Sequence, residues 1–236
     1  MNPVKSCAGI LVFAWVSFSG VLFAAGKPEV KAEKDRVSYS VGYQVGGDFK
    51  RQGVELNPDL MVKGIQDAMS GAKPLMNAKE MQETLVDLKK KVVADQQRRR
   101  EEQGKKAREA GEKFLAENAK KEGVSTLPSG LQYKVLQQGA GTSPKKTDTV
   151  TVHYKGTLVD GTEFDSSYKR GKPATFRVDG VIAGWTEALQ RMKPGARWRL
   201  FIPPNLAYGD RGAGSRIPPN STLIFDVELI SVKPGK

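Results

Sequence analysis

The chain has 236 residues, 39% of them hydrophobic, and a formal net charge of +12. This length allows one large domain or two modest ones, and the charge keeps nucleic acid, anionic membranes and acidic proteins open as partners. A single histidine and a single cysteine argue against a histidine-led catalytic triad, an internal disulfide and a zinc site. No phosphate-binding glycine loop is present either. We therefore expect neither a metal nor a cofactor.

Residues 1–25 have the pattern of a secretory signal peptide. Lys5 precedes an apolar run over residues 8–23, and the small residues Ala24 and Ala25 follow it. A basic start, an apolar core and a small-residue exit are typical of segments that signal peptidase removes. The alternative is an uncleaved anchor, because the run approaches the roughly 18 residues that span a bilayer. We favour cleavage, which removes Cys7 and leaves no integral membrane span in the exported protein.

Residues 29–76 are predicted to form short helices. The first has an apolar residue at every fourth position: Val37, Val41, Val45 and Phe49. Asn57 and Pro58 are typical of a helix start. The apolar positions of this second helix are Leu60, Met61, Ile65 and Met69. Such narrow apolar faces are too small to form a core alone, which favours association with a second chain.

Residues 77–122 are predicted to form one long charged helix. Asn77 and Glu80 have capping-box spacing, and only the first half carries an apolar stripe. Residues 89–121 contain twelve Lys or Arg against six Asp or Glu. Gly104 and Gly111 are expected to weaken the helix by about 1 kcal/mol each. A helix of about 45 residues would be about 68 Å long, so we expect its second half to be a solvated spacer.

Residues 126–236 differ in composition from the preceding residues, with frequent glycine, proline and β-branched residues. Val150, Val152 and Tyr154 alternate with polar residues, as in a half-buried strand. Asp160-Gly161 is typical of a hairpin turn, and further strands are predicted at 197–202 and 223–229. One short helix is expected near 186–191. The predicted fold class is α+β, an antiparallel sheet wrapped around one short helix.

Five segments of this region form a recognisable series. They read VHYKG with DGTEFDSS (152–167), VIAGW (181–185), AYG (207–209), IPPN (217–220) and LIFDVEL (223–229). In this order and approximate spacing they resemble the signature of FKBP-type peptidyl-prolyl cis–trans isomerases. Each segment alone would be a weak signal, whereas the series in register is a strong one.

The resemblance implies a hydrophobic pocket for a proline ring, with Trp185 as its floor. Six residues are expected to be catalytic: Tyr154, Phe164, Asp165, Trp185, Tyr208 and Phe225. Three more are expected to bind substrate: Val181, Ile182 and Ile217. Tyr208 and the Ile182 N–H would donate to substrate carbonyls. Ala174 stands where many family members have an aromatic wall residue, and Ala213 stands where some have a histidine. The resemblance therefore implies isomerase activity more firmly than it implies a particular sequence preference or inhibitor affinity.

Structural interpretations of the same residues remain open. Trp185 and Phe225 could be ordinary core aromatics, the usual fate of such side chains. Residues 217–219 could serve only to shape a rigid loop. Within the five-part series we favour the pocket. His153 points to the strand face opposite Tyr154 and is expected to be structural.

The amino-terminal part carries a second resemblance. Residues 37–43 (VSYSVGY), Gly46-Gly47 and the long charged helix are similar to the dimerisation module of Mip-like and FkpA-like periplasmic isomerases. The resemblance implies that helices of two subunits interlock and that long helices hold the catalytic domains apart. It also implies chaperone activity.

We therefore expect an exported homodimer that speeds the folding of unfolded or proline-containing polypeptides. The expected location is the periplasm or cell envelope of a Gram-negative bacterium. The first alternative is a non-catalytic chaperone or scaffold that uses the same fold for binding only. The second is a basic envelope or nucleic-acid adaptor. Export and the scarcity of aromatics among the basic residues, where Phe114 is the one example between residues 89 and 121, argue against nucleic acid as a partner.

Overall fold

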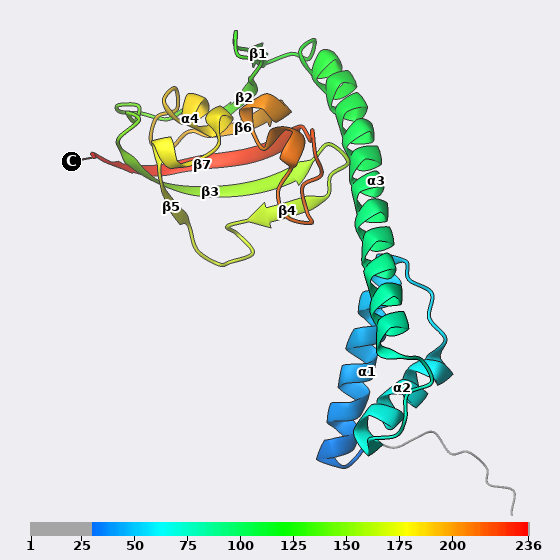
Figure 1. Cartoon of the computed structure of the whole chain (residues 1–236). Helices are drawn as coiled ribbons and strands as arrows, with labels where there is room; N and C mark the ends of the chain where they lie inside the picture. The colour runs from blue at the N-terminus through cyan, green and yellow to red at the C-terminus, as the bar shows by residue number, and fades with distance from the viewer. Residues whose placement is uncertain (1–29, 236) are drawn as a thin grey trace, which may run out of the picture. The chain divides into compact units, whose positions relative to one another are not determined.

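The computed structural model describes residues 30–235 (Figure 1). The chain forms two compact units, which divide between Asn57 and Pro58. Each unit is described by itself. The predicted signal peptide, residues 1–25, lies outside the described residues. Between residues 30 and 235, no helix combines the length and the apolar character that crossing a membrane requires.

The first unit contains helix α1 (Glu33–Gln52). Glu33 and Asp35 lie in its first turn and Lys50 and Arg51 in its last, the distribution that the helix dipole favours. Gly53 ends the helix in the left-handed conformation, with φ of 72°. No described residue of α1 is buried, so its apolar side chains gain little from this chain alone.

The second unit begins with helices α2 (Pro58–Ser70) and α3 (Ala78–Asn118). The predicted capping box of α3 is confirmed. The Glu80 N–H donates to Asn77 Oδ1 at 2.9 Å, and the Asn77 N–H donates to Glu80 Oε2 at 3.0 Å. These two bonds satisfy amide groups that the first helical turn would otherwise leave unpaired.

An antiparallel sheet follows, and the α+β prediction is confirmed. Its strands are β1 (Val124–Thr126), β2 (Gln132–Gln137), β3 (Thr149–Leu158), β4 (Glu163–Ser166), β5 (Ala174–Arg177), β6 (Arg197–Ile202) and β7 (Leu223–Lys233). Their spatial order is β1-β2-β6-β7-β3-β4, and β5 also pairs with β3. The long central strands β3 and β7 pair along most of their length. They therefore form the frame on which the rest of the region packs.

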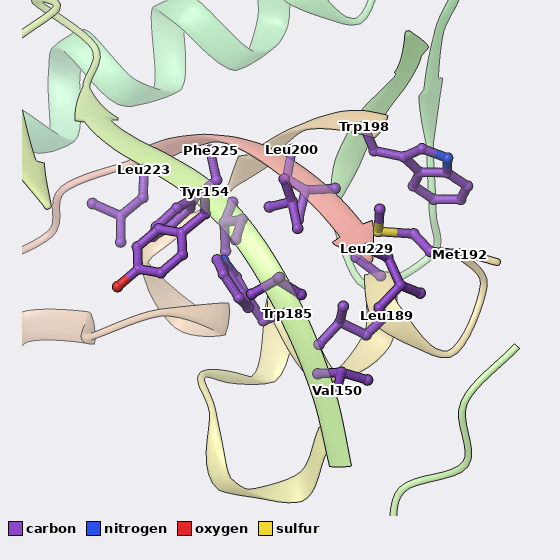
Figure 2. Close-up of a cluster of buried hydrophobic side chains, with 14 of the residues drawn as sticks. Val150, Tyr154, Trp185, Leu189, Met192, Trp198, Leu200, Leu223, Phe225 and Leu229 are labelled. Atoms are coloured by element: carbon purple, nitrogen blue, oxygen red, sulfur yellow. The ribbon is translucent and has the colours of Figure 1, made fainter. Parts of the chain in front are cut away.

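Helix α4 (Ala183–Leu189) packs against this sheet. It starts earlier than predicted because the Trp185 and Thr186 N–H groups already donate to the Ile182 carbonyl. Gly184 permits the close approach, since a Cβ there would lie 2.5 Å from Ile202 Cγ2. Figure 2 shows Leu189 in the apolar cluster between helix and sheet, where it is fully buried.

The second half of α3 corrects an expectation. We expected a solvated spacer, but Gly104, Gly111 and Asn118 are buried. The Phe114 ring lies 5.7 Å from that of Phe201 on β6. The Asn118 amide donates to Gln132 Oε1 on β2 at 2.9 Å. Only one face of the helix makes these contacts, which explains why its overall composition is that of a solvated helix.

Candidate active site

A cavity of about 760 Å³ opens beside Trp185. The structure brings every residue predicted for the site to its wall: Tyr154, Phe164, Asp165, Val181, Ile182, Trp185, Tyr208, Ile217 and Phe225. They come from β3, β4, α4, β7 and the connections beside them. Residues far apart in the sequence therefore converge on one concave surface, as expected of a small-molecule or peptide site.

Aromatic rings close the floor of the cavity. The indole of Trp185 meets the Tyr154 ring at 5.2 Å and 89°, the Phe225 ring at 5.2 Å and 81°, and the Phe176 ring at 6.0 Å and 88°. Edge-to-face pairs of this kind are favourable and fix ring orientation. Figure 2 shows Tyr154, Trp185 and Phe225 at the same end of the apolar cluster. The pocket floor is thus continuous with the core.

Trp185 belongs both to the core and to the cavity. Its exposed fraction is only 4%, yet it lines the opening. Its indole Nε1 is buried without a hydrogen-bond partner among residues 30–235. Buried donors are nearly always paired in native proteins, so this donor stands out on the wall of a binding cavity.

Gly156 of β3 allows two aromatic rings to close over the strand. A Cβ at this position would lie 2.7 Å from ring carbons of both Phe164 and Phe225. These two rings meet each other edge to face at 5.4 Å and 85°. Any larger residue at Gly156 would displace one wall of the cavity.

A hydrogen-bonded group of three side chains borders the cavity. The Tyr154 hydroxyl donates to Asp165, and Arg170 donates to Asp165 and, at 2.7 Å, to the Tyr154 oxygen. Burial raises the pKa of Asp165, but hydrogen bonds from Tyr154 and Arg170 outweigh it, and the net pKa is lowered. Burial and the bond to Asp165 raise the pKa of Tyr154. At neutral pH the group therefore holds an ionised carboxylate and a neutral phenol.

Sequence reasoning missed Arg170, which bonds to the cavity residues Tyr154 and Asp165, and the cavity-lining residue Phe176. Arg170 lies in the connection after β4, where no periodicity marks a side chain that turns back towards the site. Phe176 lines the cavity two residues beyond Ala174 on β5. Alternate residues of a strand share a face, so Phe176 supplies the aromatic wall for which Ala174 is too small.

The rim loop (residues 208–222) forms one side of the opening. It contributes residues 213–217 and Tyr208 to the lining. Tyr208 is 41% exposed, whereas Ile217 is buried. Two backbone bonds join Ala213 to Ile217 at 2.9 and 3.1 Å. Arg216, also missed from the sequence, donates to the Phe164 carbonyl at 3.2 Å and links the loop to β4.

His153 lies apart from the cavity lining. Its Nδ1 is 3.0 Å from Ser167 Oγ, and its ring stacks on Tyr168 at 4.6 Å. These contacts agree with the structural role expected for it. Within residues 30–235, no group of three or more His, Cys, Asp or Glu side chains is placed to hold a metal ion.

Comparisons with known proteins match both parts of the chain. The family model for the FKBP-type peptidyl-prolyl cis-trans isomerase matches residues 141–230. The model for the domain amino terminal to FKBP-type peptidyl-prolyl isomerase matches residues 34–135. The second match covers nearly all of α1 and the whole of α2 and α3, so the resemblance is not confined to the catalytic region.

Individual relatives are similar over most of the chain. The outer membrane protein MIP of Legionella longbeachae is 48% identical over 221 residues, which cover 92% of this chain and 94% of that protein. The peptidyl-prolyl cis-trans isomerase Mip of Coxiella burnetii is 48% identical over 204 residues, covering 86% and 89%. The crystal structure of FkpA from Escherichia coli matches with a TM-score of 0.67 and 40% identity, covering 88% of this chain and all of that chain. The chain therefore belongs to the family of FKBP-type peptidyl-prolyl cis–trans isomerases, alongside the Mip and FkpA proteins, and is an enzyme of that family.

Proposed function

We propose that the cavity beside Trp185 is where this isomerase acts, and that its substrates are proline residues of unfolded polypeptides. The observation that carries the proposal is the aromatic floor, in which Tyr154, Phe176 and Phe225 all meet the Trp185 indole edge to face. A compact apolar ring such as that of proline fits a surface of this kind. The cavity is large enough to admit the residues on either side as well.

The physical chemistry of the reaction suits an apolar cavity. Rotation about an X–Pro bond is opposed by about 18–20 kcal/mol, because amide resonance is lost at the twisted midpoint. An acceleration of about 10⁴-fold needs only about 5–6 kcal/mol of preference for that midpoint. The twisted amide is less dipolar than the planar one, so a site that excludes water favours it. The reaction needs neither a nucleophile nor a proton transfer.

Polar groups at the edge would orient the substrate. Tyr208 is exposed enough to donate to a substrate carbonyl. Ile182 precedes α4 as its N-cap residue, and the first N–H groups of a helix have no acceptor within it. The Ile182 N–H is therefore a second donor. In this proposal Asp165, held ionised by Tyr154 and Arg170, acts on the substrate carbonyl carbon through its negative field.

A pair of tryptophan variants tests the site. Trp185 and Trp198 are both buried, at 4% and 6% exposure, but only Trp185 lines the cavity. Each change to alanine should cost about 3–5 kcal/mol of stability. Isomerisation of a proline peptide, measured by exchange spectroscopy below the unfolding temperature, should fall by about 100-fold or more for Trp185→Ala alone. Equal losses per folded molecule in Trp185→Ala and Trp198→Ala would contradict the proposal.

We further propose that the chain works as a homodimer in the periplasm, with chaperone activity. Helix α1 exposes apolar side chains, including Val37 at 57%, Val41 at 56% and Tyr43 at 74%. Exposed apolar stripes of this kind are typical of surfaces that a partner covers. The pattern of residues 1–25 supports export, and one relative is named an outer membrane protein. Light scattering tests the dimer, and cell fractionation tests the location.

A further inference from the structure

Helix α3 touches the outer side of the rim loop. The Arg108 Nη2 donates to Asn220 Oδ1 at 3.2 Å, and Arg100 donates to the Arg211 carbonyl. Both acceptors lie within the loop, so two arginines of one helix hold two separate points of it. Because these acceptors are 111 and 112 residues away in sequence from their donors, the contacts are tertiary rather than local.

Two glycines bring the helix backbone against the same loop. A Cβ at Gly104 would lie 3.0 Å from Pro219 Cβ, and a Cβ at Gly111 would lie 2.4 Å from Thr222 Oγ1. Both glycines are buried. Glycine costs about 1 kcal/mol of helix stability relative to alanine. Its presence at both contact points indicates that close approach of α3 to the rim loop matters more here than the stability of the helix. The two glycines that we expected only to weaken the helix are therefore packing contacts.

These helix residues share one face. Positions 100, 104, 108 and 111 follow one another at spacings of three or four, the interval that places side chains on the same side of a helix. Asn118 and Phe114 extend this face towards β2 and β6. The helix is thus anchored to the rigid sheet at its end and to the rim loop before that end.

The inner side of the rim loop lines the catalytic cavity. Residues 213–217 and Tyr208 face the opening. The loop is narrow, since the Asn220 N–H donates to the Gly209 carbonyl at 2.8 Å and ties its two ends. Asn220 has φ of 57°, a conformation that few residues other than glycine adopt. The residue that receives Arg108 is therefore also the one that closes the base of the loop.

We propose that α3 positions the rim loop for catalysis, with Gly104, Arg108 and Gly111 as positioning residues. The helix fixes the outer side of a loop whose inner side forms the substrate cavity. None of the three lines the cavity, so they act through Tyr208 and Ile217. The isomerase pocket is complete only when this half of α3 lies against the loop. Displacement of the helix would then alter turnover.

Single substitutions in the full chain test this role. Gly111→Ala and Arg108→Ala should lower kcat/KM for a short proline peptide by roughly 3- to 30-fold. Arg99→Ala is the matched control, because Arg99 is an exposed arginine of the same helix and should leave kcat/KM unchanged. Should Gly111→Ala fail to fold, Gly104→Ala introduces a milder contact at 3.0 Å and should also lower kcat/KM.

Two further readouts separate positioning from general stability. Amide exchange at Ala213, Ile217 and Asn220 should accelerate in Gly111→Ala, because these amides close the loop. Adding Thr222→Ala removes the atom that the new Cβ meets and should restore kcat/KM at least in part. Values for Gly111→Ala and Arg108→Ala within twofold of the parent, at temperatures where both are folded, would overturn the proposal. A Gly111→Ala defect that Thr222→Ala does not relieve would also overturn it.

Discussion

The isomerase region and helix α1 differ in how far their apolar side chains are buried. In the isomerase region, apolar side chains such as Leu131, Leu200 and Leu229 have no exposed surface at all. In α1, no described residue is buried, and Val37 and Val41 are more than half exposed. At about 25 cal/mol per Å² of apolar surface removed from water, the first region is stabilised within one chain. In the proposed homodimer, the apolar side chains of α1 would be buried against the second chain.

Glycines show the same contrast. In the isomerase region a Cβ at Gly156 or Gly184 would meet atoms below 3 Å. In α1, nothing lies within 4 Å of the Cβ that Gly42 or Gly46 would carry. Gly156 and Gly184 are closely packed, whereas Gly42 and Gly46 have open space beside them. In the proposed homodimer, catalysis and assembly would therefore use separate surfaces and should fail separately.

A charge on the α1 face should have the largest effect on assembly. Val41→Glu puts a carboxylate on the apolar stripe, where burial against a partner would strip its water at a cost of several kcal/mol. We expect the mass measured by light scattering to fall from that of two chains to that of one. Turnover of a short proline peptide should stay within twofold of the parent.

The control for that change is Ser40→Glu, which adds the same charge to an exposed polar position next to it. This variant should keep the mass of the parent. Equal masses for Val41→Glu and Ser40→Glu would show that α1 is not the surface of association. A loss of peptide turnover in Val41→Glu would show that assembly and catalysis are not separate.

A methyl group at Gly156 should have the largest effect on the catalytic side. Gly156→Ala places a Cβ 2.7 Å from two phenyl rings, and overpacking of this kind typically costs about 1–3 kcal/mol. Because both rings line the cavity, kcat/KM should fall by roughly tenfold. Gly42→Ala is the matched control and should leave turnover unchanged, since nothing lies near that Cβ. A Gly156→Ala variant as active as Gly42→Ala would contradict the packing of these rings.

Much of the catalytic region could be predicted from the sequence. Strand alternation places Val150, Val152 and Tyr154 on one face, and the structure buries all three. The motif series included every residue that we assigned to the pocket, and the structure brings residues from strands, from α4 and from the rim loop to one cavity. The roles of these residues stay predictions until variants are measured.

The parts that sequence reasoning missed depend on tertiary contacts. Arg170 and Arg216 come from loops, where backbone conformation rather than periodicity decides which way a side chain points. The docking of α3 was missed because Gly104 and Gly111 were judged by helix propensity alone. A usable signal was present, since Gly104, Gly111 and Asn118 recur at intervals of seven and so share one face of a helix. Small residues in a charged helix at that interval indicate close packing.

The pH dependence of activity tests the role of Asp165 at the edge of the pocket. Burial acts to raise the pKa of Asp165, and bonds from Tyr154 and Arg170 lower it overall. A lowered folded-state pKa stabilises the fold above the ordinary aspartate value of about 3.9, and this contribution is lost as pH falls through the folded value. Arg170→Ala removes one of the two side chains that lower the pKa of Asp165, so the acid limit of activity should move to higher pH.

The control for the pH profile is Arg177→Ala. Arg177 bonds to Asp179 at 3.0 and 2.9 Å, but neither residue lines the cavity. Removing this ion pair should alter the titration of Asp179 without moving the acid limit of turnover. Superimposable profiles for Arg170→Ala and Arg177→Ala would show that Asp165 does not set that limit.

The capping box of α3 gives the smallest expected effect. Asn77→Ala removes the side chain that accepts from the Glu80 N–H and should cost about 1 kcal/mol of local helix stability. Amide exchange should accelerate in the first turns of α3, with Lys79→Ala as an exposed control from the same turn.

Peptide turnover should not change in Asn77→Ala, because the contacts to the rim loop begin only at Arg100. More than six helical turns separate Asn77 from that point at 3.6 residues per turn. Local fraying should therefore end well before the docked face. A fall in turnover would mean that α3 responds as one rigid body from its first turn. That result would contradict the separation of assembly from catalysis.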